Sequence, residues 1–214
     1  MSNSLKARVS GFHFVSGVSH EGAPHSLIVQ RGASIPASSK STKGNLYVLV
    51  EIMGTPPDAD QLAVKLTDLI HKTYANTHGS TTTALRTALR AANQFLLDEN
   101  LKSAYEAQRD GSVCCLVLRG EDAYIARSGP MATYHIRGRQ WTRFPSSDPG
   151  EVATSAMVPL GLRKEPDIAF HHLQIAAGDL LMLLESRGDQ ALSPPGFDGP
   201  PGAAATAALR QAGQ

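Results

Sequence analysis

The chain has 214 residues, of which 42% are hydrophobic, and a formal net charge of +1 from 20 basic and 19 acidic side chains. This length and composition are sufficient for a sizeable core within a single domain. Because the charges are balanced along the chain, nucleic acid and anionic membrane surfaces are not expected partners. No apolar run approaches the roughly 18 residues of a membrane span, and the N-terminus lacks a signal-peptide pattern. We expect a cytoplasmic protein.

The first half of the chain predicts short strands followed by a helical pair. Strands are expected at 12–18 and 26–29, and a polar loop at 31–45. Residues 46–52, LYVLVEI, form a continuous apolar run typical of a buried strand. From residue 58 the apolar period becomes helical, and a second helix is expected from about residue 80. The two helices should pack as an antiparallel hairpin that covers a sheet.

The second half predicts mainly strands. Three are expected at 112–120, 122–129 and 131–144, arranged as a meander with breaks at glycines. Two more, at 167–175 and 180–186, are expected to form a hairpin across a short turn. The order of strands, helical pair and further strands predicts an α+β sheet sandwich flanked by helices.

The end of the chain differs in composition from the rest. Residues 193–214 are rich in Pro and Gly and then in Ala, which predicts a loop followed by a short helix. We therefore expect residues 1–192 to form one domain. The remainder is either a tail or the last helix of that domain.

Four stretches carry a family resemblance. In chain order they are GVSHEGAPH at 17–25, VLVEIMGT at 48–55, GSV at 111–113 with ARSGPMATY at 126–134, and GDLLMLLESRG at 178–188. In order and spacing these stretches resemble the motifs of the metal-dependent type-2C (PPM-type) serine/threonine protein phosphatases. The resemblance spans about residues 11–188. It implies a type-2C phosphatase-like β-sandwich of antiparallel sheets flanked by helices. The final strand of the family has no counterpart in the sequence up to Gln214.

The matching positions are mostly those that set turns and packing. They are Gly17, Met53, Gly54, Gly111, Gly129, Tyr134, Gly161, Gly178 and Asp179.

The resemblance also identifies positions where the family has reactive groups and this chain does not. His20 stands where the family has its phosphate-binding arginine, and His25 where it has the first metal-binding aspartate. Glu51 occupies the second aspartate position, Ile52 the metal-contacting glycine, and Ser186 the later aspartate. The family binds two magnesium or manganese ions bridged by a water, and such ions need several carboxylate oxygens. A single carboxylate cannot hold two such ions.

The resemblance therefore implies a catalytically degenerate domain, a pseudophosphatase, that acts as a binding or regulatory module. No cofactor is expected, and the partner would be another protein or a fused domain. Glu51 is then a strand-end carboxylate, solvated or paired with a neighbouring Arg or Lys.

Two alternatives remain open. The first is a weakly active phosphatase in which magnesium or manganese is held by an unusual Glu/His set, at most Glu51 with Glu185 among the carboxylates. The second is a soluble sensor fused to a further domain, because a chain that stops at Gln214 would leave a strand edge unpaired.

The remaining histidines are weaker candidates. His171 and His172 are adjacent in a predicted strand, so they face opposite ways and cannot chelate one metal together. His20 and His25, with His13, could approach a zinc or iron ion, but no spacing requires it. Structural or surface roles are the simpler interpretation.

Other conspicuous residues also have simple structural explanations. Cys114 and Cys115 are adjacent in an apolar strand, which favours two buried, unreactive thiols on opposite faces and a reducing compartment. Arg86 and Arg90 lie one helical turn apart and either grip a phosphate or form a solvated helix face. Trp141, the single tryptophan, either covers the end of a sheet or anchors a partner.

Overall fold

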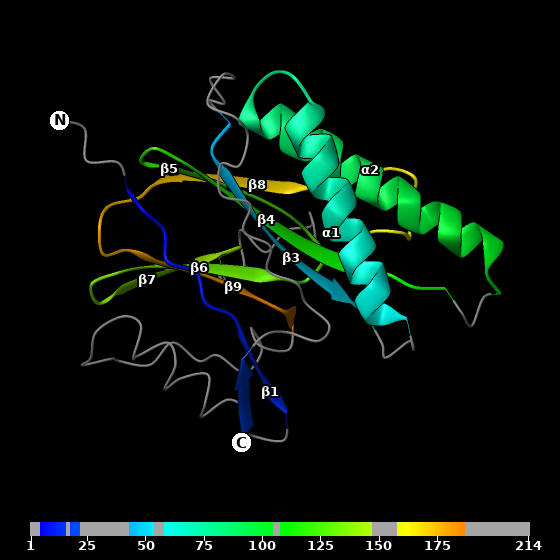
Figure 1. The fold of residues 1–214 in the computed structure, drawn as a ribbon, viewed down its shortest axis with the longest axis horizontal. Helices are drawn as coiled ribbons and strands as arrows, with labels where there is room; N and C mark the ends of the chain where they lie inside the picture. The colour runs from blue at the N-terminus through cyan, green and yellow to red at the C-terminus, as the bar shows by residue number, and fades with distance from the viewer. Residues whose placement is uncertain are drawn as a thin grey trace.

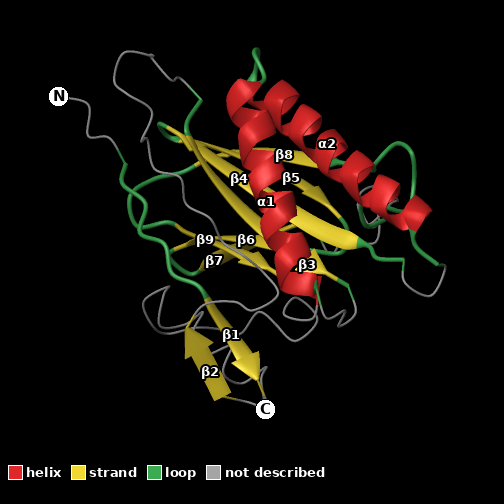
Figure 2. Cartoon of the chain, turned by 45° about the vertical axis from the view of Figure 1, so that its right-hand side comes forward, coloured by secondary structure: helices red, strands yellow, loops and turns green. Residues whose placement is uncertain are grey.

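The protein is a sandwich of two antiparallel sheets with a helical pair packed on one outer face (Figures 1 and 2). The structure, a computed structural model, describes residues 5–15, 18–21, 43–53, 58–104, 108–146 and 158–186. Its elements are β1 (Phe12–Val15), β2 (Val18–Glu21), β3 (Asn45–Ile52), α1 (Ala59–Asn76), α2 (Thr81–Lys102), β4 (Gly111–Arg119), β5 (Asp122–Ser128), β6 (Ala132–Arg137), β7 (Gln140–Phe144), β8 (Ala169–Gln174) and β9 (Leu180–Leu184).

The two main sheets have the strand orders β3-β4-β5-β8 and β7-β6-β9, and β1 and β2 form a separate pair. The predicted α+β sandwich of antiparallel sheets is confirmed. The single strand predicted at 12–18 is wrong, because the chain reverses after Val15 and β2 runs back beside β1. The strand predicted at 26–29, the segment 193–214 and the missing final strand all lie outside the described residues.

The predicted meander is also wrong, since β4 and β5 pair in the first sheet but β6 does not pair with β5 and lies in the second sheet. At Gly129 the chain leaves that sheet, and β6 begins the second one. Gly129 has φ +89°, and a Cβ atom there would lie 2.3 Å from Ser112 Oγ, so only glycine fits this crossing. The strand expected at 131–144 is in fact two, because a turn at Gly138 folds β7 back against β6.

The hairpin predicted from 167–175 and 180–186 is a crossing between sheets. β8 pairs with β5 at the edge of the first sheet, whereas β9 pairs with β6 in the second. Alternation within each strand looks the same in either arrangement, so the sequence pattern did not separate the two. The turn at 176–179 therefore ties the two sheets together.

The helical pair follows the prediction. α2 begins at its N-cap Ser80, whose Oγ accepts a hydrogen bond from Thr83 N at 3.1 Å. The buried faces of α1 and α2 pack on one face of the first sheet, where Val48 and Val50 of β3 lie in the same cluster as Leu66 and Leu89. Figure 2 shows both helices on the side away from β6, β7 and β9.

A second core fills the space between the sheets. Tyr47 and Leu49 point into it, because they alternate along β3 with the valines that face the helices. Leu181 and Leu183 pack against this core from β9. The first sheet is thus packed on both faces, by the helices on one side and by the second sheet on the other.

The two cysteines lie on opposite faces of β4, as predicted. Cys115 belongs to the core under the helices and Cys114 to the core between the sheets. Both thiols are fully buried, and burial raises the pKa of Cys114 to about 11 and that of Cys115 well above its ordinary value. A thiol held in its neutral form is a poor nucleophile.

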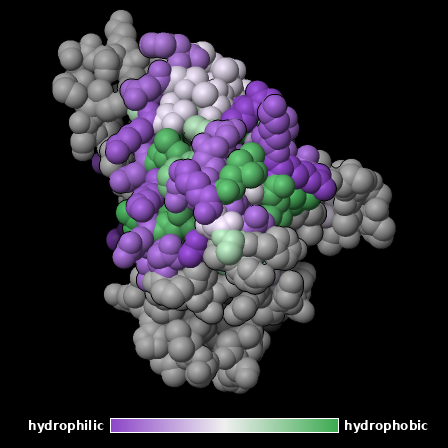
Figure 3. Space-filling view, turned by 90° about the vertical axis from the view of Figure 1, so that its right-hand side faces the viewer, coloured by the Kyte–Doolittle hydropathy of each residue, from purple (hydrophilic) through white to green (hydrophobic). Residues whose placement is uncertain are grey.

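Within the described ranges, no helix is long and apolar enough to cross a membrane. On the face seen in Figure 3, hydrophilic side chains predominate and apolar ones form small separate groups.

Candidate functional site

The first polar site lies where β3 ends, at one end of the sandwich. Glu51 is the next-to-last residue of β3 and stands opposite Ser112 of β4. Its neighbours along β3 are buried apolar residues, and its side chain is only 8% exposed. A carboxylate in this position needs hydrogen-bond donors, because an unsatisfied buried charge is costly.

Ser186, just beyond β9, supplies those donors. Its backbone N donates to Glu51 Oε2 at 3.1 Å, and its hydroxyl lies 2.8 Å from Oε1 and 3.0 Å from Oε2. The two residues are 135 positions apart in the chain, and Ser186 is only 6% exposed. The fold thus brings together two of the positions singled out by the family resemblance, and they contact each other directly.

A second carboxyl group lies beside this pair. Burial raises the pKa of Asp110, and the negative charge of Glu51 raises it further, while a hydrogen bond from backbone lowers it. The carbonyl of Asp110 accepts from Met53 N at 3.1 Å, which ties the end of β3 to the start of β4. Asp110 thus places a second carboxyl group close enough to Glu51 for the two groups to interact.

Buried asparagines of α2 hold the loops around the site. Asn100 Nδ2 donates to the carbonyls of Arg109 at 2.6 Å and Gly161 at 3.0 Å, and its Oδ1 accepts from Arg109 N at 2.8 Å. Leu160 and Gly111 exchange two backbone hydrogen bonds, at 2.8 and 3.2 Å. Gly161 has φ +90°, and a Cβ atom there would lie 2.9 Å from Leu96 Cβ, so this loop can lie so close to α2 only with glycine.

Three of the other predicted site positions, Ile52, His20 and Glu185, lie within the described residues. Ile52 is buried and packs in the core under the helices. His20 lies in β2, where its backbone stands opposite His13. His25 lies outside the described residues, as do the fold-marking glycines Gly17 and Gly54.

The described residues do not fit a pair of hard divalent cations at Glu51. Within the part of the chain that the structure describes, no three His, Cys, Asp or Glu side chains are grouped to hold a metal ion. Both oxygens of Glu51 face hydrogen-bond donors from Ser186, whereas a cation needs those lone pairs. Within the described residues, Glu51 has its hydrogen-bonding capacity met by Ser186.

The histidines of β8 face opposite sides, as predicted. His172 Nε2 lies 2.8 Å from Asp122 Oδ1, and its ring stacks at 4.7 Å on Tyr124. His171 instead packs 5.0 Å from the ring of Phe144. Neither arrangement is that of a metal site.

The candidate phosphate-binding arginines, Arg86 and Arg90, and the tryptophan also have local contacts. Arg86 lies over the ring of Phe170 at 4.6 Å, and Arg90 Nη2 lies 3.1 Å from a carboxylate oxygen of Glu165. These contacts agree with an ordinary exposed helix face. Trp141 lies on the edge strand β7 and packs edge-on against Tyr134 at 6.0 Å, so it covers the sheet.

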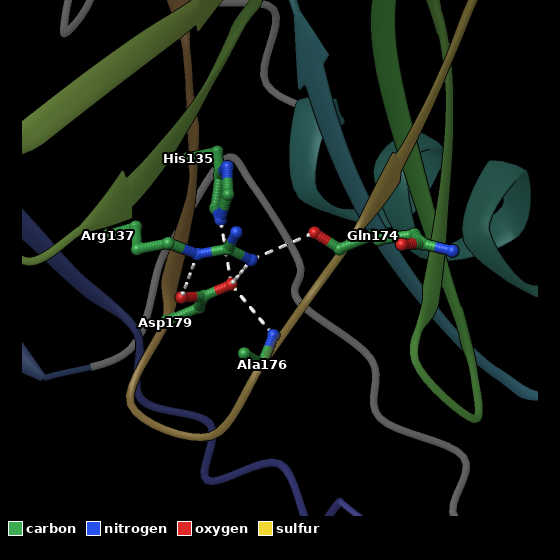
Figure 4. A network of polar contacts seen from close by, with 5 residues as sticks. All are labelled: His135, Arg137, Gln174, Ala176 and Asp179. Carbon is green, nitrogen blue, oxygen red and sulfur yellow. Dashed lines mark hydrogen bonds and ion pairs between the residues drawn. The ribbon is translucent and has the colours of Figure 1, made fainter.

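The sequence-based prediction missed a second polar network, at the other end of β9. Asp179 Oδ1 accepts from Arg137 Nε at 2.9 Å, and its Oδ2 accepts from Arg137 Nη2 at 2.7 Å and Ala176 N at 2.9 Å (Figure 4). His135 Nε2 lies 2.9 Å from the same Oδ2. The Arg137 hydrogen bonds, chiefly, hold the pKa of Asp179 well below its ordinary value.

A sequence signal for this network did exist. His135 and Arg137 are two residues apart on β6, so they project from the same face of the strand. From the sequence, Asp179 is only one of the positions that match the family, since no local pattern places the turn before β9 against the end of β6.

The chain has the fold of the type-2C, or PPM-type, serine/threonine phosphatases. The structure of a bacterial serine phosphatase carrying a point mutation superposes with a TM-score of 0.70 at 15% identity, covering 97% of this chain and 92% of the other. PppA, a key regulatory component of T6SS in Pseudomonas aeruginosa, gives 0.59 at 18% identity over 99% and 93%.

The catalytic domain of the serine/threonine protein phosphatase PstP, in complex with two manganese ions, gives a TM-score of 0.61 at 16% identity over 96% of this chain and 92% of that one. No protein-family profile matches the sequence, and no curated protein sequence matches it. At these identities the likeness establishes the fold, and the predicted resemblance is confirmed at that level.

Proposed function

We propose that this protein is a pseudophosphatase: a type-2C phosphatase-like domain that has lost the metal chemistry and acts as a binding or regulatory module. The observation that carries the proposal is the contact between Glu51 and Ser186. In the family, both positions carry aspartates that bind the catalytic cations. Here one of them donates hydrogen bonds to the other.

The replacement removes negative charge where cations would require it. A serine hydroxyl and a backbone N–H are neutral donors, and they satisfy the carboxylate without an ion. His25 further lowers the number of carboxylate oxygens at the positions that match the family motifs. Two hard cations with a bridging water need several carboxylate ligands, and the reaction needs both ions.

The direct test measures turnover and metal binding together. The purified protein is incubated with manganese and a generic phosphoester, and manganese binding is titrated calorimetrically. The proposal expects no metal-dependent hydrolysis and no tight isotherm. Metal-dependent turnover that disappears in Glu51→Ala would refute it.

A gain-of-function variant sharpens the test. Ser186→Asp restores a carboxylate beside Glu51, so the two groups repel each other unless a cation lies between them. We expect this variant to be less stable than wild type in a chelator and to regain stability with manganese. Ser186→Asn, of the same size but neutral, is the matched control and should show no manganese response.

A second candidate function is a weakly active metal-dependent phosphatase with an unusual Glu/His metal set. It is favoured by the negative charge of Asp110 beside Glu51 and by the manganese ions in the PstP domain of the same fold. Its ligands would be Glu51 with His25 or Glu185, and its ion magnesium or manganese. Saturable binding at millimolar metal would support this candidate, and its absence would exclude it.

A binding module needs a partner, and we propose another protein or a fused domain. PppA, which shares the fold, is a regulatory component in its own system. The balanced charge of this chain argues against nucleic acid. We propose the cytoplasm as its location, in keeping with two buried free thiols.

A further inference from the structure

A pocket lies at the opposite end of the sandwich from Glu51. Its volume is about 410 Å³, within the usual range for small-molecule sites. It is bounded by Leu5 before β1, Glu121 in the β4–β5 turn, Arg137 at the end of β6, and residues 174–177 after β8. It lies beside the Asp179 network and shares no residue with the Glu51–Ser186 pair.

Both sheets contribute to this pocket through the end of β8. Glu121 O accepts from Ile175 N at 2.7 Å, and the carbonyl of the preceding Gln174 accepts from Arg137 Nη2 at 3.0 Å. The end of β8 is thus hydrogen-bonded to Glu121 in the β4–β5 turn of the first sheet and to Arg137 of the second sheet. The two charged residues therefore flank the same short stretch of backbone.

Arg137 is fixed before any ligand arrives. Its Nε and Nη2 are held by the two oxygens of Asp179 in a bidentate pair, and the side chain remains 51% exposed. In the described structure its Nη1 has no hydrogen-bond partner, and Figure 4 shows this nitrogen without a dashed line. A rigid guanidinium with a free N–H is a ready recognition group for a carboxylate.

A positively charged group of a ligand would bind to Glu121 and not to Asp179. Asp179 cannot serve, because Arg137, His135 and Ala176 already fill its acceptor sites with four hydrogen bonds. Glu121 is exposed, and its carboxylate has no hydrogen-bond or ion-pair partner among the described residues. The rest of the wall is mixed and comes from Leu5, Gln174, Ile175, Ala176 and Ala177.

We propose that this pocket binds a small aliphatic zwitterion of the amino-acid class. The ligand carboxylate would accept from Arg137 Nη1, its ammonium would donate to Glu121, and its alkyl group would lie against Leu5 and Ile175. The held guanidinium of Arg137, the carboxylate of Glu121 and the aliphatic side chains of the lining match a molecule with the same three parts. The proposal is independent of the function proposed for the Glu51 end.

The test is an NMR titration of the full chain with L-leucine, followed on backbone amides. We expect saturable shifts at residues 174–177 with a dissociation constant on the order of 1 mM. Two half-ligands, 4-methylpentanoate without the ammonium and isopentylamine without the carboxylate, should each bind at least about 10-fold more weakly, since each loses a charge-assisted hydrogen bond.

Variants locate the contacts. Glu121→Gln keeps the size of an exposed side chain and should weaken leucine binding about 10-fold, whereas Glu165→Gln, an exposed glutamate paired with Arg90, should leave it unchanged. Arg137→Lys keeps a positive charge for Asp179 but lacks Nη1, and should also weaken binding. Absence of saturable shifts at 174–177, equal binding of either half-ligand, or unchanged affinity in Glu121→Gln would overturn the proposal.

Discussion

A carboxylate lies at each end of β9: Asp179 just before the strand, and Glu51 of β3 beside its far end. The two carboxylates accept hydrogen bonds from different kinds of partner. Asp179, just before the strand, is paired with Arg137 and also receives hydrogen bonds from His135 and backbone. Glu51, reached by Ser186 just after the strand, has only neutral donors from that residue. The two sites are separated by roughly 20 Å of extended chain.

The two ends differ in whether the carboxylate has a positively charged partner. At the Asp179 end an arginine of the chain itself compensates the carboxylate, so this end can be stable without any ion. At the Glu51 end no cationic side chain is among the partners in the described structure, and Asp110 adds further negative character. Substitutions at the two ends should therefore act through different partners, the charged Arg137 at Asp179 and the neutral donors of Ser186 at Glu51.

The largest expected effect is at the Asp179 end. Asp179→Asn should lower the free energy of unfolding by about 2 kcal/mol or more, because hydrogen bonds to a buried charged acceptor are lost and Arg137 loses its partner. Urea denaturation measures the change. Asp122→Asn, which removes a more exposed partner of His172, is the control and should cost within about 0.5 kcal/mol. If both variants lowered the free energy of unfolding equally, the Asp179–Arg137 pair would contribute no more to stability than the more exposed Asp122–His172 pair.

Acid should erase the difference between wild type and Asp179→Asn. The pKa of Asp179 in the folded protein is lowered far below its ordinary value, so its contribution is fully present above the unfolded pKa of about 3.9 and is lost as the pH falls from there through the folded pKa. Denaturation midpoints measured from neutral pH downward should begin to approach each other below about pH 4 and should meet only at pH values below the folded pKa. Midpoints that differ by a constant amount across this range would contradict the assignment.

The smallest effect is expected at the Glu51 end. Ser186→Ala removes the hydroxyl donor but keeps the backbone N–H, so it should cost about 1–2 kcal/mol. If the protein acts without metal, adding manganese should leave this cost unchanged. A variant that becomes more stable than wild type in manganese would favour the metal-binding alternative, because the alanine would then have freed the carboxylate for an ion.

The elements of the fold were largely predictable from local patterns. The helical period of α1 and α2, the cap at Ser80 and the alternation along β4 are all short-range signals, and each predicted the observed burial. Sheet membership was not predictable in this way, since β6 and β9 alternate just as they would in the first sheet. The crossings at Gly129 and at 176–179 depend on contacts between distant segments.

The sites were predictable only in part. The resemblance to a family selected both Glu51 and Ser186, and the fold brings them into contact, although their role remains a proposal. The pairing of Arg137 with Asp179 was missed, because it joins residues 42 positions apart that no spacing rule connects. Side chains at strand ends meet according to how the sheets are stacked, and that stacking is set by the apolar cores.

The adjacent thiols of β4 can report separately on two local unfolding events, separation of the helices from the first sheet and separation of the two sheets. An alkylating reagent reaches Cys115 only when the helical layer lifts from the sheet, and reaches Cys114 only when the two sheets part. Comparing the modification rates at these neighbouring positions would show which layer of the molecule detaches first.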